Sequence, residues 1–209
     1  MRSPPLLRRF LQAIACLLLV PAGTLAQSVD VKALAESLRN GGYVIVFRHG
    51  ATHRDQADTD PLNFDDVSRQ RLLSDAGRQA AAQVGLAFRT LQIPVGKVYT
   101  SRFHRAIETG KLIGTGEVSA TPDLTEGGLV VTPIENDRRA QALRDMVAAP
   151  PEKGRNTLLV THKPNLLDAF GKDWFDVKEG EASVFRPAGD GKATLVARVQ
   201  AAEWIGAAK

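Results

Sequence analysis

Two histidines and two arginines in this sequence are of the residue types that handle phosphate, and each comes at or shortly after a predicted buried strand. They are Arg48, His49, Arg105 and His162. A neutral imidazole is a nucleophile, and near pH 7 a useful fraction of an unperturbed histidine is neutral. Arginine offers a planar fork of donors that matches phosphate oxygens in pairs. Gathered in one place, these four side chains would repel one another unless an anion such as a phosphate dianion joined them.

The elements that must position these residues alternate between strands and helices. Continuous apolar runs at 43–47 and 157–161 are typical of strands buried on both faces, and 97–100 indicates a shorter strand. Helical spacing or helix-start signals predict helices over 30–40, 74–91, 102–113, 135–149 and 163–170. This alternation predicts an α/β fold, a three-layer α/β/α sandwich with a mainly parallel central sheet. Ligands of such sheets bind outside the carboxyl ends of the strands, where the four side chains would meet.

Other segments complete this predicted organisation. Ser74 and Ser101 are expected to cap the helices that follow them. A short strand is expected near 118–121, and two runs joined through Gly189-Asp190-Gly191 predict a final hairpin, 182–186 with 193–199. The polar segment 51–71 lacks both periodicities, so a solvated loop that could line a pocket mouth is expected.

The N-terminus resembles a secretory signal peptide. Arginines occupy positions 2, 8 and 9, an eleven-residue apolar block covers 10–20, and the small-residue segment 22–26 follows Pro21. Because a membrane-spanning helix needs about 20 residues, cleavage after Ala26 is favoured over a retained anchor. The expected organisation is a signal peptide over 1–26 and one domain over 27–209, located in the periplasm or secreted. The lone Cys16 would leave with the signal, so the exported domain would contain no disulfide.

The composition fits an ordinary globular domain. Of 209 residues 44% are hydrophobic, 24% charged and 6% aromatic, with a net charge of +4. Removing the three N-terminal arginines would lower the charge to about +1, so the basic balance indicates no particular partner. Few aromatic residues and scattered charges argue against a nucleic-acid partner, and no stable membrane insertion is expected after cleavage. The oligomeric state is left open.

Four motifs occur in an order that resembles the histidine phosphatase superfamily, with its phosphoglycerate-mutase-like fold. They are Arg48-His49-Gly50 with Thr52, the helix start at 73–80, Thr100-Ser101 through Arg105 to Thr109, and Val160-Thr161-His162. The resemblance spans 42 to about 170. It implies that His49 attacks phosphorus and forms a transient phosphohistidine, which water hydrolyses. It further implies that Arg48, Arg105 and His162 hold the phosphoryl oxygens, that Thr52 adds a hydroxyl, and that neither metal nor organic cofactor is needed.

The leaving oxygen also needs a proton, which a carboxylic acid near the pocket can supply. Glu126 resembles the family's acid, and Asp123 is the alternative. The predicted function is an exported, metal-independent phosphomonoesterase for small phosphate esters or a phosphorylated envelope component such as a sugar. A phosphomutase and an inactive relative that binds phosphate esters remain as alternatives. A metallohydrolase using His49 and His53 is disfavoured, because the glycine-containing segment between them follows a strand rather than forming a helix.

Overall fold

A six-stranded sheet forms the centre of the computed structural model, which describes residues 29–114, 116–127 and 130–209. The predicted signal peptide lies outside the described residues. The strand order is β3-β2-β4-β1-β5-β6. The strands are β1 (Val44–Arg48), β2 (Val95–Thr100), β3 (Val118–Ala120), β4 (Asn156–Thr161), β5 (Ala182–Pro187) and β6 (Ala193–Val199). The four strands β1 to β4 pair in parallel, whereas β5 and β6 join antiparallel as the predicted hairpin. The mainly parallel sheet is therefore confirmed.

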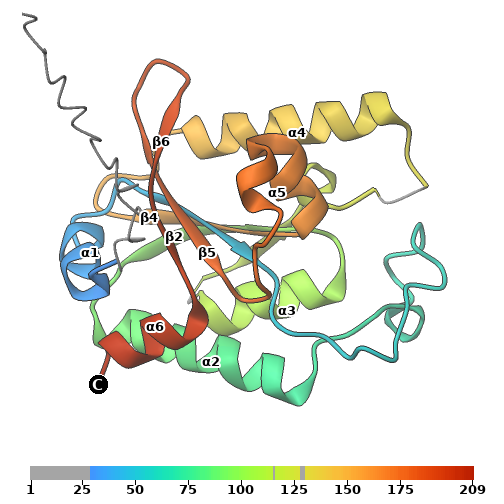
Figure 1. Cartoon of the computed structure of the whole chain (residues 1–209), viewed down its shortest axis with the longest axis horizontal. Coiled ribbons are helices and arrows are strands. Elements are labelled where there is room, and N and C mark those ends of the chain that lie inside the picture. The colour runs from blue at the N-terminus through green and yellow to red at the C-terminus, as the bar shows by residue number, and fades with distance from the viewer. Residues whose placement is uncertain (1–28, 115, 128–129) are drawn as a thin grey trace, which may run out of the picture.

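Helices cover both faces of this sheet (Figure 1). Successive side chains of β1 point to opposite faces, so Ile45 and Phe47 join one hydrophobic cluster and Val44 and Val46 the other. The first cluster includes residues of α1 (Val31–Leu38), α2 (Asp75–Thr90), α3 (His104–Ile113) and α6 (Ala201–Ala207). The second includes α4 (Pro133–Ala148) and α5 (Lys163–Phe170). These two cores, one on each side of the sheet, confirm the three-layer α/β/α sandwich.

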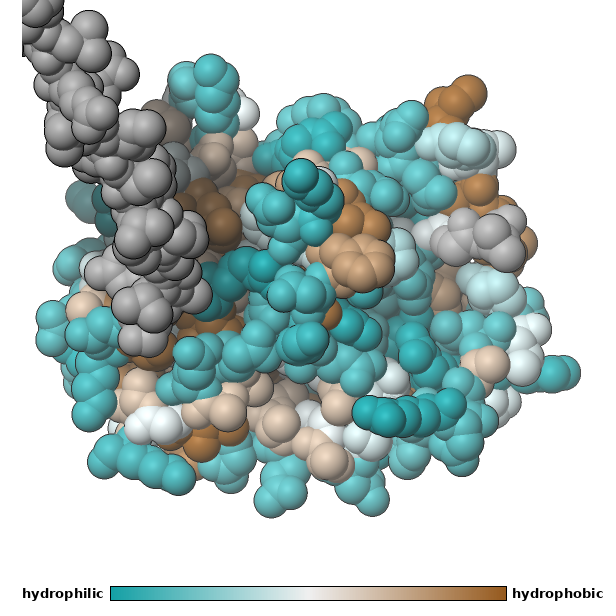
Figure 2. Space-filling model, in the orientation of Figure 1, coloured by the Kyte–Doolittle hydropathy of each residue, from teal (hydrophilic) through white to brown (hydrophobic). Residues whose placement is uncertain are grey.

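The polar surface agrees with this layering. Hydrophilic side chains cover much of the face drawn in Figure 2, since the helices turn their apolar stripes toward the sheet. Among the described residues, no helix combines the length and the apolar character needed to cross a membrane.

Several details differ from the sequence-based predictions, and one of them is that β2 begins at Val95 rather than at residue 97. The helix expected from residue 102 begins at His104, and Ser101 does not cap it. Helix α4 starts at Pro133, two residues earlier than expected, because the Thr132 hydroxyl accepts a hydrogen bond from the Glu135 amide. The C-terminal helix α6 was not predicted from the sequence, although its buried Trp204 packs into the first core.

The polar segment 51–71 is a loop, as predicted, but it is held in place rather than merely solvated. It contains a short 3-10 turn, Val67–Arg69. Side chains in its first half accept hydrogen bonds from backbone amides 13 and 16 positions later in the chain. Gln56 accepts from the Leu72 amide and Asp58 from the Arg71 amide. The loop therefore has a defined course near the carboxyl edge of the sheet.

Candidate active site

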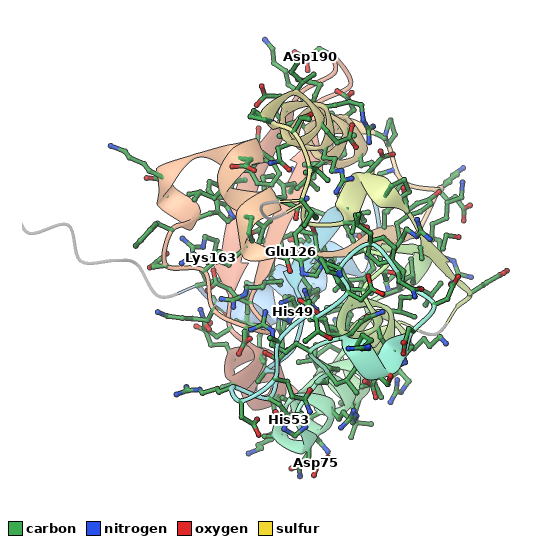
Figure 3. The ribbon with its side chains drawn as sticks, turned by 90° about the vertical axis from the view of Figure 1, so that its right-hand side faces the viewer. His49, His53, Asp75, Glu126, Lys163 and Asp190 are labelled. Carbon is green, nitrogen blue, oxygen red and sulfur yellow. The ribbon has the colours of Figure 1, made fainter. Side chains whose placement is uncertain are left out.

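The register of the three neighbouring parallel strands brings their carboxyl ends together. Arg48 on β1 lies opposite Thr161 on β4, and Thr100 on β2 lies opposite Val160. The residues that follow these strands therefore meet at one edge. The His49 amide donates to the Thr161 carbonyl (3.0 Å), and the rings of His49 and His162 lie 5.1 Å apart between centroids. In Figure 3, which looks onto this edge, His49 and Glu126 lie near each other at the centre.

His49 is held as a neutral imidazole with one nitrogen available. Its side chain is 2% exposed, and its Nδ1 lies 2.8 Å from the Gly50 carbonyl oxygen. Because a carbonyl only accepts hydrogen bonds, this contact assigns the proton to Nδ1 and leaves the lone pair on Nε2. Burial, followed by the nearby His162 and Arg105, lowers the pKa of His49 well below its ordinary value. At neutral pH the ring is therefore a nucleophile without prior deprotonation.

Arg105 lies fully buried in the first turn of α3. Its Nη1 donates to Asp58 Oδ1 (3.0 Å) and to the Arg71 carbonyl (3.3 Å), and its Nη2 forms an ion pair with Glu126 Oε1. The guanidinium carbon lies 4.1 Å from the centre of the Phe103 ring. Its Nε is buried and has no hydrogen-bond partner among the described residues. The guanidinium is thus fixed on one side and has an unused donor on another.

Arg48 is held by the loop that precedes β5. Its Nη1 donates to the Val177 carbonyl (2.8 Å), and its Nη2 lies 3.5 Å from Glu179 Oε1. Burial lowers the pKa of Arg48, while its carboxylate neighbours partly oppose that shift. The same Glu179 oxygen accepts from the Thr52 hydroxyl (3.0 Å), so Thr52 lies beside Arg48 with its hydroxyl directed at Glu179. As in Arg105, Nε of Arg48 is buried without a partner in the described structure.

His162 stands between Ser101 and Glu126. Its Nε2 lies 2.7 Å from the Ser101 hydroxyl oxygen, and its Nδ1 lies 3.3 Å from Glu126 Oε1 without hydrogen-bond geometry. Burial and the charges of Arg105, Arg71 and Arg48 lower the pKa of His162 well below its ordinary value. The Ser101 hydroxyl, which was predicted to cap a helix, therefore contacts the second histidine, and α3 begins only at His104.

The structure places Glu126, and not Asp123, at the site. Glu126 is 19% exposed and contacts both Arg105 and His162. Asp123 instead pairs with Arg138 (2.7 Å) at the surface. The carbonyl of Thr125, the residue before Glu126, accepts from Arg139 (2.9 Å) and Asn165 (3.3 Å), which fixes the backbone that carries the acid.

Sequence reasoning did not identify four of the residues that complete the site. Asp58 and Arg71 come from the loop 51–71, Glu179 from the segment before β5, and Ser101 was assigned a different role. No periodicity marks the first three, and only their polarity within a predicted mouth loop could have drawn attention to Asp58 and Arg71.

The other two histidines lie outside this set. In Figure 3 His53 lies away from His49, in the direction of Asp75 at the start of α2. His104 Nδ1 is 3.8 Å from Glu108 on the outer side of α3. Within 29–114, 116–127 and 130–209, no three side chains of the types His, Cys, Asp and Glu are grouped so as to hold a metal ion.

Comparison with known proteins supports a common fold. The model of the histidine phosphatase superfamily (branch 1) matches residues 44–131. The protein histidine phosphatase SixA complexed with tungstate superposes with a TM-score of 0.53 at 18% identity, covering 77% of this chain and 97% of that one. For phosphoserine phosphatase of Entamoeba histolytica in complex with 3-phosphoglyceric acid the TM-score is 0.52 at 18% identity, with 75% and 95% covered.

A third structure, a mycobacterial glucosyl-3-phosphoglycerate phosphatase with inorganic phosphate, has a TM-score of 0.54 at 17% identity, with 79% of this chain and 99% of that chain covered. No curated protein matches the chain in sequence. At these identities the structural likeness establishes the fold, and the family model covers the strand β1, the opening histidine motif and the second arginine motif. The chain therefore resembles the histidine phosphatase superfamily over residues 44–131, and it shares the fold of these solved phosphatases.

Proposed function

We propose that the protein is a phosphomonoesterase that works through a phosphohistidine at His49. One observation carries the proposal: three buried nitrogen atoms around His49, namely Arg48 Nε, Arg105 Nε and His162 Nδ1, have no hydrogen-bond partner in the described structure. A buried polar group without a partner costs about 1–3 kcal/mol. A tetrahedral oxyanion has several acceptor oxygens and would supply partners to the two arginine N–H donors at once. The site is therefore suited to a phosphoryl group in front of the His49 nucleophile.

The first chemical step transfers the phosphoryl group to the protein. His49 Nε2 donates its lone pair to phosphorus, and the bond from phosphorus to the ester oxygen breaks in line with this attack. Glu126, in its protonated form, gives its proton to the departing oxygen, so the alcohol leaves neutral. Arg48 and Arg105 stabilise the charge on the three equatorial oxygens.

The second step regenerates the enzyme. Water attacks phosphorus, the Glu126 carboxylate accepts a proton from that water, and the bond between phosphorus and His49 Nε2 breaks. Inorganic phosphate leaves, and His49 is again neutral with its proton on Nδ1. Glu126 is protonated again; it releases this proton when it pairs with Arg105 in the free protein and takes one up again beside the next bound phosphate dianion. In this scheme the two arginines and His162 hold the phosphoryl oxygens, and Glu126 transfers the protons.

The test is phosphate release by residues 27–209 in the presence of a chelator, from p-nitrophenyl phosphate and a panel of alkyl and sugar phosphates. Release should persist in chelator and should vanish in His49→Ala. The matched control is His53→Ala, a histidine of the same region that lies away from the site and should retain activity. No release by the folded wild type from any ester would overturn the proposal and favour an inactive phosphate-binding relative.

For the substrate we propose a small phosphate ester or a phosphorylated sugar of the cell envelope. A solved structure of similar fold belongs to a phosphatase named for a glucosyl-3-phosphoglycerate, which supports sugar phosphates as the first part of the panel. If phosphosugars rank below simple alkyl phosphates in kcat/KM, the sugar proposal fails. Product analysis in the same assay separates hydrolysis from phosphomutase activity, because a mutase would return the phosphoryl group to the sugar.

We also propose export with cleavage after Ala26, on the strength of the N-terminal arginines and the apolar block that follows them. Expression of the full chain in a two-membraned bacterium, followed by fractionation and N-terminal sequencing, tests this directly. A periplasmic protein that starts at Gln27 is the expected result. An intact Met1 N-terminus in the membrane fraction would instead indicate a retained anchor.

A further inference from the structure

The donors of Arg105 are used unevenly. A guanidinium has five N–H donors. The two on Nη1 are engaged by Asp58 and the Arg71 carbonyl, one on Nη2 faces Glu126, and the one on Nε has no partner in the described structure. The edge formed by Nε and Nη2 presents two parallel donors, which is the geometry that grips two phosphate oxygens. The edge that could bind phosphate is therefore the edge opposite Asp58.

Asp58 fixes the orientation of the Arg105 guanidinium and so determines which of its edges is left to bind a ligand. The Phe103 ring, 4.1 Å from the guanidinium carbon, sets the plane of the group but leaves its rotation within the plane undefined. The contact of 3.0 Å from Nη1 to Asp58 Oδ1 removes this freedom. The same Asp58 oxygen accepts from the Arg71 amide (2.9 Å), and the Arg71 carbonyl accepts a second hydrogen bond from Arg105 Nη1. Asp58 itself is 20% exposed, so it is held by these contacts rather than freely solvated.

We propose that Asp58 is a positioning residue that acts through Arg105, turning the Nε and Nη2 edge of its guanidinium toward the phosphoryl group. The inference rests on the proposed function, because it assumes that this site binds a phosphoryl group. Asp58 comes from the loop 51–71, far in sequence from Arg105, and does not itself bind the substrate. Asp58 instead determines how well Arg105 binds the phosphoryl group.

The acceptor oxygen of Asp58, and not its charge, carries this role. A carboxylate near a phosphate dianion repels it, so the charge by itself opposes binding. An asparagine keeps an acceptor oxygen for Nη1 and for the Arg71 amide but has no charge. Asp58→Asn should therefore bind phosphate at least as tightly as the wild type, whereas Asp58→Ala should bind it more weakly.

Calorimetric titration with inorganic phosphate at pH 7.5 measures this without turnover. For Asp58→Ala we expect Kd to rise about tenfold, which corresponds to the loss of one well-aligned charge-assisted hydrogen bond. Gln56→Ala is the matched control, since Gln56 anchors the same loop through the Leu72 amide but does not touch Arg105. Its Kd should stay within about twofold of the wild type. With p-nitrophenyl phosphate, Asp58→Ala should raise KM more than Asp58→Asn does.

Several results would overturn the proposal. Unchanged phosphate affinity in Asp58→Ala would show that Arg105 needs no such orientation. Equal weakening in Asp58→Ala and Gln56→Ala would assign the effect to loop order. Weakened binding in Asp58→Asn would show that the acceptor oxygen is not sufficient, and this variant decides the matter if Asp58→Ala does not fold. If the wild type itself does not bind phosphate, the proposed function fails instead, which distinguishes the two failures.

Discussion

Replacing Glu126 by glutamine should separate proton donation from phosphate binding. The side chain keeps its size but cannot donate a carboxylic acid proton. General acid catalysis typically contributes 10²- to 10⁴-fold, so hydrolysis of alkyl phosphates should slow by about that factor. A p-nitrophenolate leaving group needs little protonation, so release from p-nitrophenyl phosphate should fall by about tenfold at most.

The structure gives the direction of a second effect of the same substitution. Glu126 Oε1 forms an ion pair with Arg105 Nη2 and lies 3.3 Å from His162 Nδ1, two groups assigned to the phosphoryl oxygens. In the free protein the carboxylate therefore competes with phosphate for the same donors. A neutral amide competes less, so the inhibition constant of inorganic phosphate should stay equal to the wild-type value or fall.

The assay compares kcat/KM for an alkyl phosphate and for p-nitrophenyl phosphate, together with phosphate inhibition, in wild type, Glu126→Gln and Asp123→Asn. Asp123 pairs with Arg138 at the surface, so its substitution should leave all three quantities near their wild-type values. Equal losses on both esters in Glu126→Gln would refute the role of Glu126 as proton donor. A large rise in the phosphate inhibition constant would refute the argument from competition.

Three further outcomes are expected from local geometry. Burial lowers the pKa values of His49 and His162, so both rings stay neutral in the folded state, whereas the unfolded chain takes up protons below about pH 6.5. Below this pH, each of the two histidines should therefore lower the free energy of unfolding by up to about 1.4 kcal/mol per pH unit. Urea unfolding between pH 5 and 8 measures this loss. Stability that does not fall over this range would contradict their burial as neutral rings. In Gly77→Ala the new Cβ would lie 2.0 Å from the Ala51 carbonyl oxygen, so the start of α2 must shift. The free energy of unfolding should fall by about 1–3 kcal/mol or more. An unchanged midpoint of thermal unfolding would show that the backbone relaxes this contact without cost. Asn156→Ala removes three hydrogen bonds that the fully buried Asn156 amide makes with backbone groups of Leu38, Tyr43 and Pro94. The free energy of unfolding measured by calorimetry should fall by about 3 kcal/mol. A fall below about 1 kcal/mol would contradict the stabilising role of these hydrogen bonds.

The strands could be predicted because their signals are local. The run 43–47 is apolar and β-branched at nearly every position, as a strand buried on both faces requires, and the same holds for 157–161. Ser74 caps α2 as predicted, since its hydroxyl accepts from the Gly77 amide three residues later. Such signals depend only on residues close by in the sequence, so they can be recognised without knowledge of the fold.

The prediction for Ser101 was wrong for the opposite reason. A serine after a strand and before a helix has the sequence context of a cap, and its hydroxyl does accept from the Phe103 amide (3.1 Å). The helix nevertheless begins only at His104, and the hydroxyl also contacts His162 Nε2, 61 positions along the chain. Which contact a hydroxyl makes depends on what the fold places beside it.

The sequence by itself determined that His49, Arg105 and His162 come after predicted strands of a parallel sheet, because each strand carries its own local signal and the carboxyl ends of parallel strands meet at one edge. Only the tertiary structure decided which carboxylates contact Arg105 and His162. Glu126 rather than Asp123 reaches the site, and Asp58 comes to hold Arg105 from a loop without any periodicity. The physical reason is that ion pairs between segments far apart in the sequence depend on three-dimensional distance, which no local pattern of residue types encodes.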